Sequence, residues 1–230
     1  MERYNRQIIL PELGEEGQRR LQRAKVLIVG VGGLGSPIAL YLTGAGVGTI
    51  GLADDDLVSI SNLQRQVLYS EAEIGLPKVL QASIRLKALN SDVKINTYHT
   101  RLTQSNAEEI ISEYDIIVDG CDNFATRYLI NDTCVRLGKV YVYGAIRAFD
   151  GQVSVFNYQG GPDYRHFFPD EEEMLLMPHP PKGVLGVTPG IVGCAEATEV
   201  LKIIGGYGDV LSGKLWVIDL KTMQTHIISL

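Results

Sequence analysis

The amino-acid sequence predicts an α/β fold: a doubly wound, mostly parallel β-sheet with an antiparallel C-terminal extension. Short apolar runs alternate with longer helix-like stretches up to about residue 145, as in strands joined by helices on both faces of a sheet. A glycine-rich turn separates the first apolar run from the first long helix. Beyond residue 145, strand-like segments follow one another across short turns, which indicates antiparallel pairing. We expect one domain over residues 1–230, with a parallel half over about 1–145 and an extension over about 146–230.

The elements of the parallel part follow from this alternation. The expected strands cover residues 25–30, 49–53, 93–98, 115–119 and 140–145. The expected helices cover residues 14–24, 34–45, 77–90, 105–113, 124–137 and, within the extension, 190–204. Pro77 suits the first position of a helix and Gly138 the end of one, whereas Asn123 suits the N-terminal cap.

The extension is predicted to begin with a hairpin. Strand-like residues 141–147 and 152–158 flank Ala148-Phe149-Asp150-Gly151, and Asp-Gly is a typical hairpin turn. Two late strands are expected at 215–219 and 224–229.

A long crossing loop is expected between these strands, over residues 158–182. This segment holds five of the nine prolines and an acidic run from Asp170 to Glu173. A structureless loop of this length is either functional or a mobile surface loop, and both interpretations stay open.

Composition excludes several classes of protein. A net charge of −6 argues against general nucleic-acid binding. No apolar run approaches the length of a membrane span, about 18 residues. The polar N-terminus does not resemble a secretory signal, and the three cysteines form no C-x-x-C pair, so a reducing cytoplasm is the expected compartment.

The turn Gly30-Val31-Gly32-Gly33-Leu34-Gly35 predicts a nucleotide site. It follows the apolar residues Val26–Val29 and opens a helix, so its backbone and the helix N-terminus are positioned to bind phosphate. Asp54 lies about 20 residues further on, where such folds hold a ribose hydroxyl. Asp55 or Asp56 replaces it if the strand ends later. The turn by itself leaves the nucleotide open, and a redox dinucleotide is the default.

Cations near this turn favour a triphosphate over a redox dinucleotide. Arg65 and Lys78 follow the acidic cluster, with Asn62 beside them, and Arg6 lies near the N-terminus. A redox dinucleotide presents only its bridging pyrophosphate, whereas a triphosphate that loses pyrophosphate builds up negative charge that positioned cations stabilise. Asp122, at the end of a predicted strand, is expected to hold Mg²⁺ through carboxylate oxygens.

Five motifs in order give the chain a family resemblance over residues 3 to about 220. They are Arg3-Tyr4-x-Arg6-Gln7, Gly30-x-Gly32-Gly33-Leu34-Gly35, Ser61-Asn62-Leu63-x-Arg65-Gln66, Gly75-x-Pro77-Lys78 and Asp119-x-x-Asp122-Asn123. The chain thereby resembles the ThiF/MoeB/HesA adenylyltransferases, relatives of the ubiquitin-activating enzymes. The resemblance implies that ATP activates the C-terminal Gly-Gly carboxylate of a small ubiquitin-like sulfur carrier as an acyl-adenylate, in thiamin or molybdopterin synthesis.

The resemblance also implies roles for individual residues. Arg65, Lys78 and Asp122 are expected to be catalytic, with Mg²⁺ accompanying ATP at Asp122. Arg6 is expected to reach the ATP of a neighbouring subunit, which implies a homodimer; packing on its own subunit is the alternative. Asp119 is interpreted as a structural helix cap. The cysteines Cys121 and Cys194 are interpreted as packing residues.

The chain departs from the family pattern in two places. Residues 163–166 read Asp-Tyr-Arg-His where many members carry the first of two C-x-x-C pairs that bind zinc, so we expect no zinc site. His179 stands where some members carry a cysteine, so we expect no covalent link to the carrier there and a separate sulfurtransferase. A peptide or tRNA substrate and an NAD-dependent oxidoreductase remain the alternative functions.

Overall fold

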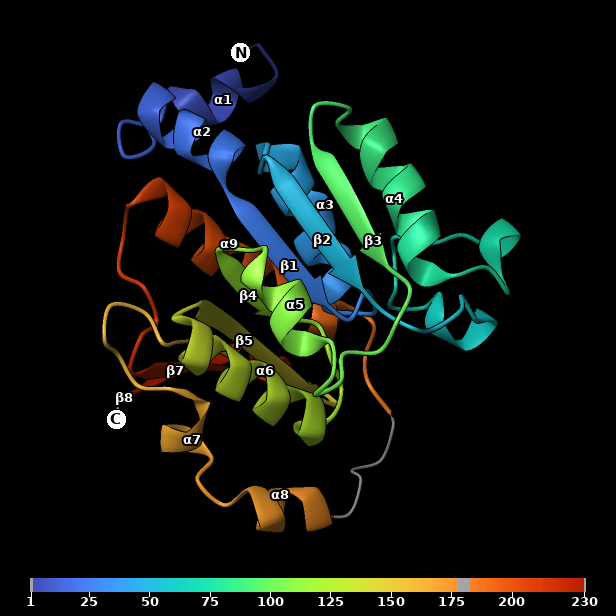
Figure 1. Ribbon diagram of the computed structural model, residues 1–230, viewed down its shortest axis with the longest axis vertical. Coiled ribbons are helices and arrows are strands. Elements are labelled where there is room, and N and C mark those ends of the chain that lie inside the picture. Colours follow the sequence, from blue (N-terminus) through green and yellow to red (C-terminus); the bar gives the residue numbers. More distant parts are fainter. Residues whose placement is uncertain (1, 178–182, 230) are drawn as a thin grey trace.

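The computed structural model describes residues 2–177 and 183–229, in which one eight-stranded sheet has the order β3-β2-β1-β4-β5-β6-β7-β8 (Figure 1). The strands are β1 (Lys25–Val29), β2 (Thr49–Ala53), β3 (Lys94–Tyr98), β4 (Ile116–Asp119), β5 (Val140–Arg147), β6 (Asp150–Phe156), β7 (Lys214–Asp219) and β8 (Gln224–Ser229). The helices are α1 (Asn5–Ile8), α2 (Gly14–Arg23), α3 (Gly35–Ala45), α4 (Lys78–Leu89), α5 (Ala107–Ser112), α6 (Phe124–Leu137), α7 (Tyr164–Phe167), α8 (Glu171–Leu176) and α9 (Val187–Gly205). Short 3-10 turns are η1 (Glu2–Tyr4), η2 (Ile60–Asn62) and η3 (Glu71–Glu73).

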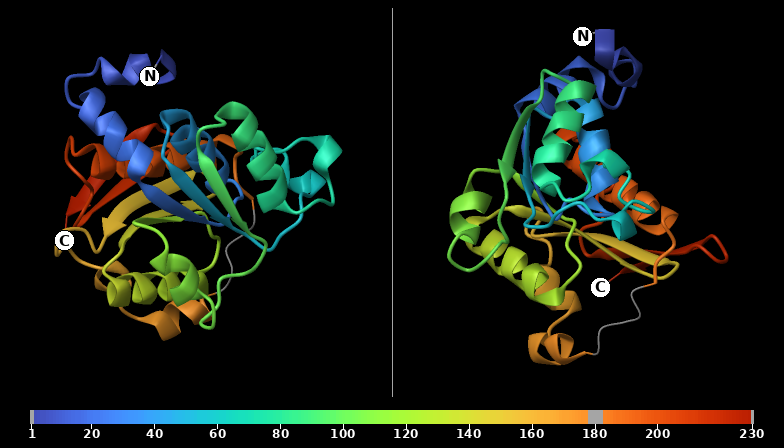
Figure 2. Two further views of the ribbon diagram at one scale, coloured as in Figure 1. Left: turned by 45° about the horizontal axis from the view of Figure 1, so that its top comes forward. Right: turned by 90° about the vertical axis from the view of Figure 1, so that its right-hand side faces the viewer.

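Helices cover both faces of the sheet (Figure 2). α3, α4 and α9 pack on one face, where Ile38, Val79 and Val200 are fully buried. α5 and α6 pack on the opposite face through Ile111 and Ile130, which are also fully buried. This confirms the predicted doubly wound arrangement, in which each face of the sheet needs an apolar cover.

The strand order reverses at β1. β1 pairs in parallel with β2 on one side and with β4 on the other. The chain therefore winds outward through β2 and β3 and then returns to β4 on the other side of β1. Loops that leave the carboxyl ends of β1 and β4 diverge, and open α/β sheets bind ligands in the crevice between such loops.

The antiparallel extension continues the same sheet, but the predicted hairpin turn is wrong by two residues. β5 and β6 pair from Tyr141 opposite Phe156 to Arg147 opposite Asp150, so Asp150 and Gly151 belong to the strand. The turn lies at Ala148, whose φ is +52°. Gly151 is a glycine for another reason, because a Cβ there would lie 2.2 Å from Cγ2 of Val192 on α9.

Two further predictions are corrected. The loop expected over 158–182 contains the helices α7 and α8 in its described part. These helices are too short to show a hydrophobic period, and they begin at the side-chain caps Asp163 and Asp170. Pro77 is the residue before α4 and not its first residue.

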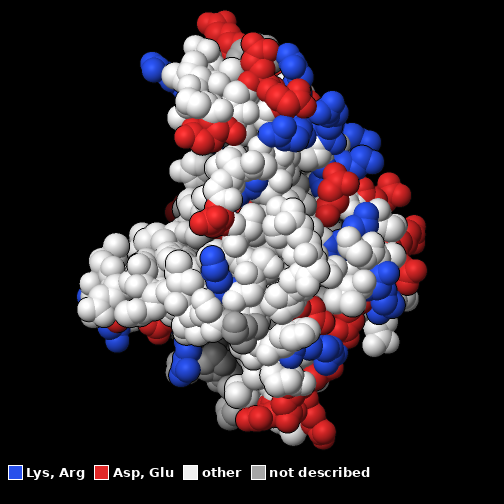
Figure 3. All heavy atoms as spheres, turned by 90° about the vertical axis from the view of Figure 1, so that its left-hand side faces the viewer, with Lys and Arg blue, Asp and Glu red and all other residues white. Residues whose placement is uncertain are grey.

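The N-terminal helices carry charges of both signs. Figure 3 shows Lys and Arg mixed with Asp and Glu at the top of this face, over the N-terminal end of the chain. On α2, Arg19 pairs with Glu15 at 2.8 Å, and both side chains are more than half exposed. Among the residues that the structure describes, no helix is long and apolar enough to cross a membrane.

Candidate active site

The glycine turn leads from the carboxyl end of β1 into α3 and packs against Gly120, which directly follows β4. Gly30 has a φ of +90°, and a Cβ on it would lie 2.5 Å from the carbonyl oxygen of Gly120. A Cβ on Gly35 would lie 2.1 Å from the carbonyl oxygen of Gly30. The protein's own backbone therefore requires these two glycines. Gly32 and Gly33 line the adjoining pocket and leave its floor without side chains, next to the N-terminus of α3.

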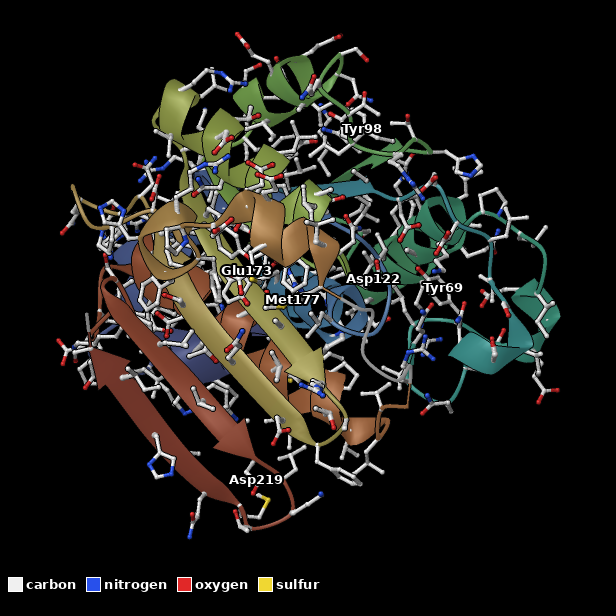
Figure 4. All side chains as sticks on the ribbon, turned by 90° about the horizontal axis from the view of Figure 1, so that it is seen from below. Tyr69, Tyr98, Asp122, Glu173, Met177 and Asp219 are labelled. Atoms are coloured by element: carbon white, nitrogen blue, oxygen red, sulfur yellow. The ribbon has the colours of Figure 1, made fainter. Side chains whose placement is uncertain are left out.

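The pocket at this crevice has a volume of about 830 Å³ and two ends. One end is lined by the glycine turn and by the polar residues Asp54, Asp55, Asp56, Asn62, Arg65, Gln66, Lys78, Arg101, Asp122 and Arg127. The other end reaches the antiparallel strands and α8 through Gln152, Phe168, Met174, Met177 and Val217. Figure 4 labels one residue from each end of this pocket, Asp122 and Met177.

Asp54 directly follows β2 and anchors the glycine turn. Its Oδ2 accepts the N–H of Val31 at 2.7 Å, and its Oδ1 accepts the N–H of Asp56 at 2.8 Å. Burial raises the pKa of Asp54, while the charge of Lys78 and these hydrogen bonds oppose the shift. Each carboxylate oxygen keeps capacity for one more donor, so the residue fits the predicted ribose contact.

Lys78 is a buried cation and not an ordinary surface lysine. Its side chain is only 4% exposed, and its Nζ lies 2.7 Å from Oδ2 of Asp56, whose side chain is 63% exposed. The N–H of Lys78 also donates to the carbonyl of Asp56, which fixes the first turn of α4. A charge held in the pocket wall by one carboxylate keeps donors that a bound anion can use.

Arg65 crosses the glycine turn from the neighbouring loop. Its Nη1 donates to the carbonyl of Ser61 at 3.0 Å, and its N–H donates to the carbonyl of Asn62. A Cβ on Gly33 would lie 3.6 Å from Cγ of Arg65, so the arginine stem passes directly over the turn. The structure thus brings Asn62, Arg65 and Lys78 to one pocket from segments that follow β2.

Asp122 is exposed at the pocket edge, just beyond β4. The next residue, Asn123, caps α6 by accepting the N–H of Thr126 at 2.9 Å, as predicted. An exposed carboxylate at the edge of this pocket fits the chemistry of a Mg²⁺ ligand. Asp54, Asp55 and Asp56 also place ligand oxygens within 4.8 Å of one another, but all three carboxylates already have polar partners.

Asp119 is not the helix cap that the sequence suggested. It is fully buried, and its Oδ2 accepts from Nε of Arg127 at 3.0 Å and from the hydroxyl of Tyr141 at 2.9 Å. Burial lowers the pKa of Arg127, but Asp119, Tyr143, Cys121 and Tyr141 together outweigh it and raise the pKa well above its usual value. Sequence reasoning missed Arg127, although it follows the Asp122-Asn123 motif by one helical turn.

Cys121 lines the pocket as a protonated thiol. Its Sγ lies 2.7 Å from Oδ1 of Asp119, and burial together with the Asp119 charge raises the thiol pKa well above its usual value. Because the thiolate is the nucleophile, the pocket wall offers little cysteine reactivity here. Cys194 is half-buried on α9 beside Pro37 and Ile191.

Two predicted features lie away from the pocket. Arg6 is exposed on α1, which Figure 1 places toward the amino ends of the strands, and it does not line the pocket. At residues 163–166, Asp163 caps α7 and its Oδ1 lies 2.7 Å from Nδ1 of His166. One oxygen and one nitrogen that already bind each other do not fit a four-thiolate zinc site. His179 lies outside the described residues.

Comparison with known proteins agrees with this geometry. Residues 4–230 match the model of the ThiF family. A probable molybdopterin-synthase adenylyltransferase of Porphyra purpurea is 50% identical over 92% of this chain and 56% of its own length. A sulfur carrier protein adenylyltransferase of Thermus thermophilus is 49% identical over 95% of this chain and 83% of its own length.

A solved structure shares the fold of this chain. The crystal structure of E. coli MccB with ATP superposes with a TM-score of 0.82 at 25% identity, over 92% of this chain and 65% of that chain. The chain spans little more than half the length of the Porphyra relative. Since a family model matches nearly its whole length and relatives are about half identical to it, the chain belongs to the ThiF family.

Proposed function

We propose that this chain is an ATP-dependent adenylyltransferase that activates the C-terminal Gly-Gly carboxylate of a small ubiquitin-like sulfur carrier. The names of the Porphyra and Thermus relatives support this activity, and the crystal structure of MccB with ATP supports ATP as the nucleotide. The observation that carries the proposal is the pocket itself. It joins a glycine turn and a group of cations that includes Arg65 and Lys78 at one end to a partly apolar end at the other.

The reaction needs no protein nucleophile. A carboxylate oxygen of the carrier attacks the α-phosphorus of ATP, the bond from that phosphorus to the bridging oxygen breaks, and pyrophosphate leaves. The substrate carboxylate is already ionised, so the enzyme moves no proton. Catalysis then consists of alignment and charge stabilisation. The protonated thiol of Cys121 agrees with this mechanism.

Each site residue has a role in this scheme. Gly32 and Gly33 let the phosphates approach the N-terminus of α3, and Asp54 accepts a ribose hydroxyl. Arg65 and Lys78 neutralise the charge that builds on the leaving pyrophosphate. Lys78 suits this role because it is held as a buried point charge.

Asp122 is the residue that would hold Mg²⁺ with ATP. When bound, the ion neutralises phosphate charge and orients the leaving oxygens. The carboxylate supplies a hard oxygen ligand at the pocket edge, and Asn123 behind it fixes the start of α6.

Arg6 is proposed to act in the pocket of a second copy. Helix α1 lies toward the amino ends of the strands, away from the pocket of its own subunit. The exposed side chain of Arg6 is therefore available to contact a second subunit. A homodimer with two shared sites follows. We also propose a cytoplasmic enzyme and a separate sulfurtransferase that delivers sulfur to the acyl-adenylate.

The test is ATP–pyrophosphate exchange in the presence of Mg²⁺ and candidate carriers, each with and without its terminal Gly-Gly. We expect exchange only with an intact tail, because the reverse reaction requires the acyl-adenylate. The carrier that supports exchange assigns the chain to thiamin or molybdopterin synthesis. Binding of ATP without exchange by any carrier would contradict the proposed substrate.

A further inference from the structure

Residues 163–177 build the part of the pocket wall that lies away from the glycine turn. Phe168, Met174 and Met177 line this end together with strands β6 and β7. If the nucleotide fills the polar end, as the proposed function requires, the substrate tail must lie against this wall. The position of α8 then sets the shape of the acyl-substrate end of the pocket.

Helix α8 packs against the apolar core through Met174 but buries no residue fully. It contains six residues, and none of them is buried. Leu175 is 50% exposed and Leu176 is 77% exposed. A helix of this length is not stable by itself, so contacts outside the helix must fix it.

Arg165 on α7 supplies the ionic contact. Its Nε lies 2.8 Å from Oδ1 of Asp132 on α6, and its Nη2 lies 2.7 Å from Oδ2 of the same carboxylate. The same Nη2 lies 2.7 Å from Oε2 of Glu171, the first residue of α8. Within residues 2–177 and 183–229, this is the only ion pair that a residue of α8 makes.

The guanidinium also stacks on a ring that is linked to the pocket wall. It lies 4.8 Å from the ring centroid of Tyr128, and the hydroxyl of Tyr128 donates to the carbonyl of Phe168 at 2.8 Å. The ring of Phe168 lies 5.9 Å from that of Tyr143, which also lines the pocket. Arg165 is therefore linked to the pocket through α8 and through an aromatic contact.

The chemistry of this cluster favours a firm attachment. The hydrogen bonds from Arg165 lower the pKa of Asp132, so the carboxylate stays ionised over the neutral range. A bidentate guanidinium–carboxylate pair is stronger and more directional than a simple surface ion pair. Without the arginine, Asp132 and Glu171 would face each other as two like charges and push α6 and α8 apart.

We propose that Arg165 is a positioning residue for the acyl-substrate end of the pocket. It fastens α8 to α6 and thereby holds Phe168, Met174 and Met177 in place for the acyl substrate. This inference rests on the proposed function for the identity of the substrate. The attachment of α8 by Arg165 is independent of it.

The kinetic test compares Arg165→Gln with the wild-type protein and with Arg19→Gln, which removes two exposed ion pairs on α2. We expect Arg165→Gln to raise the KM for the carrier about tenfold, the effect of losing one charge-assisted hydrogen bond. The KM for ATP and the kcat at saturating carrier should change less than twofold. Arg165→Lys should also raise the carrier KM, because an ammonium cannot form the fork. Arg19→Gln should match the wild type.

A second measurement does not depend on activity. The peptide bonds after the exposed residues Leu175 and Leu176 are chymotrypsin sites, and Arg165→Gln should be cleaved there severalfold faster than the wild type. If Arg165→Gln fails to fold, Glu171→Gln replaces it in this test. That variant keeps the pair between Arg165 and Asp132 and should show the same faster cleavage. A metal chelator should leave the cleavage rate of the wild-type protein unchanged.

The outcomes separate the two proposals. An equal rise in both KM values, or no change in carrier KM and cleavage, would overturn the role of Arg165. Loosening of α8 by a chelator would show that a metal holds it. If the wild-type protein shows no exchange with any carrier, the proposed function fails, while the cleavage rates still decide whether Arg165 fastens α8.

Discussion

At the scale of single residues, the pocket cations Lys78 and Arg65 differ in how they are held. Lys78 is buried against one carboxylate, whereas Arg65 spans the glycine turn and is anchored by the carbonyl of Ser61. A buried ammonium offers a fixed point charge, and a guanidinium fork can bridge two phosphate oxygens. The pocket thus combines one rigid cation with one planar cation of wider reach.

Lys78→Met and Arg65→Ala should each lower kcat for adenylate formation by about 10²–10³-fold, the usual loss for one preorganised electrostatic group. Both changes remove charge without emptying an apolar core, so circular dichroism should be unchanged. Arg23→Ala, on the exposed face of α2, is the matched control and should behave as wild type. Normal exchange by either pocket variant would remove that residue from the catalytic set.

At the scale of elements, α9 approaches β5 through an unusual contact. A Cβ on Gly144 would lie 2.3 Å from the carboxyl carbon of Glu196, so the absence of a side chain on β5 makes room for this group. Glu196 is fully buried, and neither of its oxygens has a hydrogen-bond partner among the described residues. Burial and the charge of Asp119 raise its pKa well above 4.5, although Arg127 opposes them.

This contact makes stability depend on pH. Above about pH 4.5 the unfolded chain releases the Glu196 proton while the folded protein keeps it, so stability falls as pH rises toward the folded pKa. Below that pH, both states are protonated and this dependence vanishes. Glu196→Gln should therefore gain unfolding free energy relative to wild type by about 1.4 kcal/mol per pH unit in this window.

Denaturant unfolding of both proteins at pH 5 and pH 8 measures this effect. The difference in unfolding free energy should be larger at pH 8. Titrating groups that do not interact with Glu196 are common to both proteins and cancel in the comparison. A difference that stays constant with pH would mean that Glu196 is ionised in the folded state.

At the scale of the whole molecule, the pocket lies at the carboxyl ends of the strands, where the glycine turn, Arg65, Lys78 and Asp122 line it. Arg6 lies toward the amino ends of the strands. If Arg6 acts between subunits, an isolated subunit lacks one of the charged side chains assigned to catalysis, and only a dimer completes the site. The arrangement therefore predicts complementation between two differently mutated subunits.

Arg6→Ala and Asp122→Ala should each be nearly inactive alone. A mixture should regain about a quarter of wild-type activity, because random dimers leave one intact site in half of the molecules. The regained activity is measured as the rate of ATP–pyrophosphate exchange after the two variants have been mixed and their subunits have re-equilibrated. Activity no higher than that of the separate variants would place Arg6 in its own subunit and remove the shared site.

Much of the fold was predictable because its signals are local. The parallel strands and most helices begin and end within three residues of the predicted positions. Their signals are local, because an apolar run forms the strand itself and a cap such as Asn123 directly precedes its helix. Gly151 was misread, because a glycine in a turn and a glycine under a helix look alike in sequence. Which one it is depends on Val192, a residue of α9.

For the candidate site, the residue types, their order and the family to which they point could all be read along the chain. The folded arrangement was needed to learn which of these residues share a pocket, that Lys78 is buried and that Asp119 is a buried ion-pair partner of Arg127 and not a cap. It was also needed to find that Arg165, on α7, pairs with residues of α6 and α8. Motif spacing is a property of the chain, whereas burial and ion pairing arise from residues that are distant in sequence and meet only on folding.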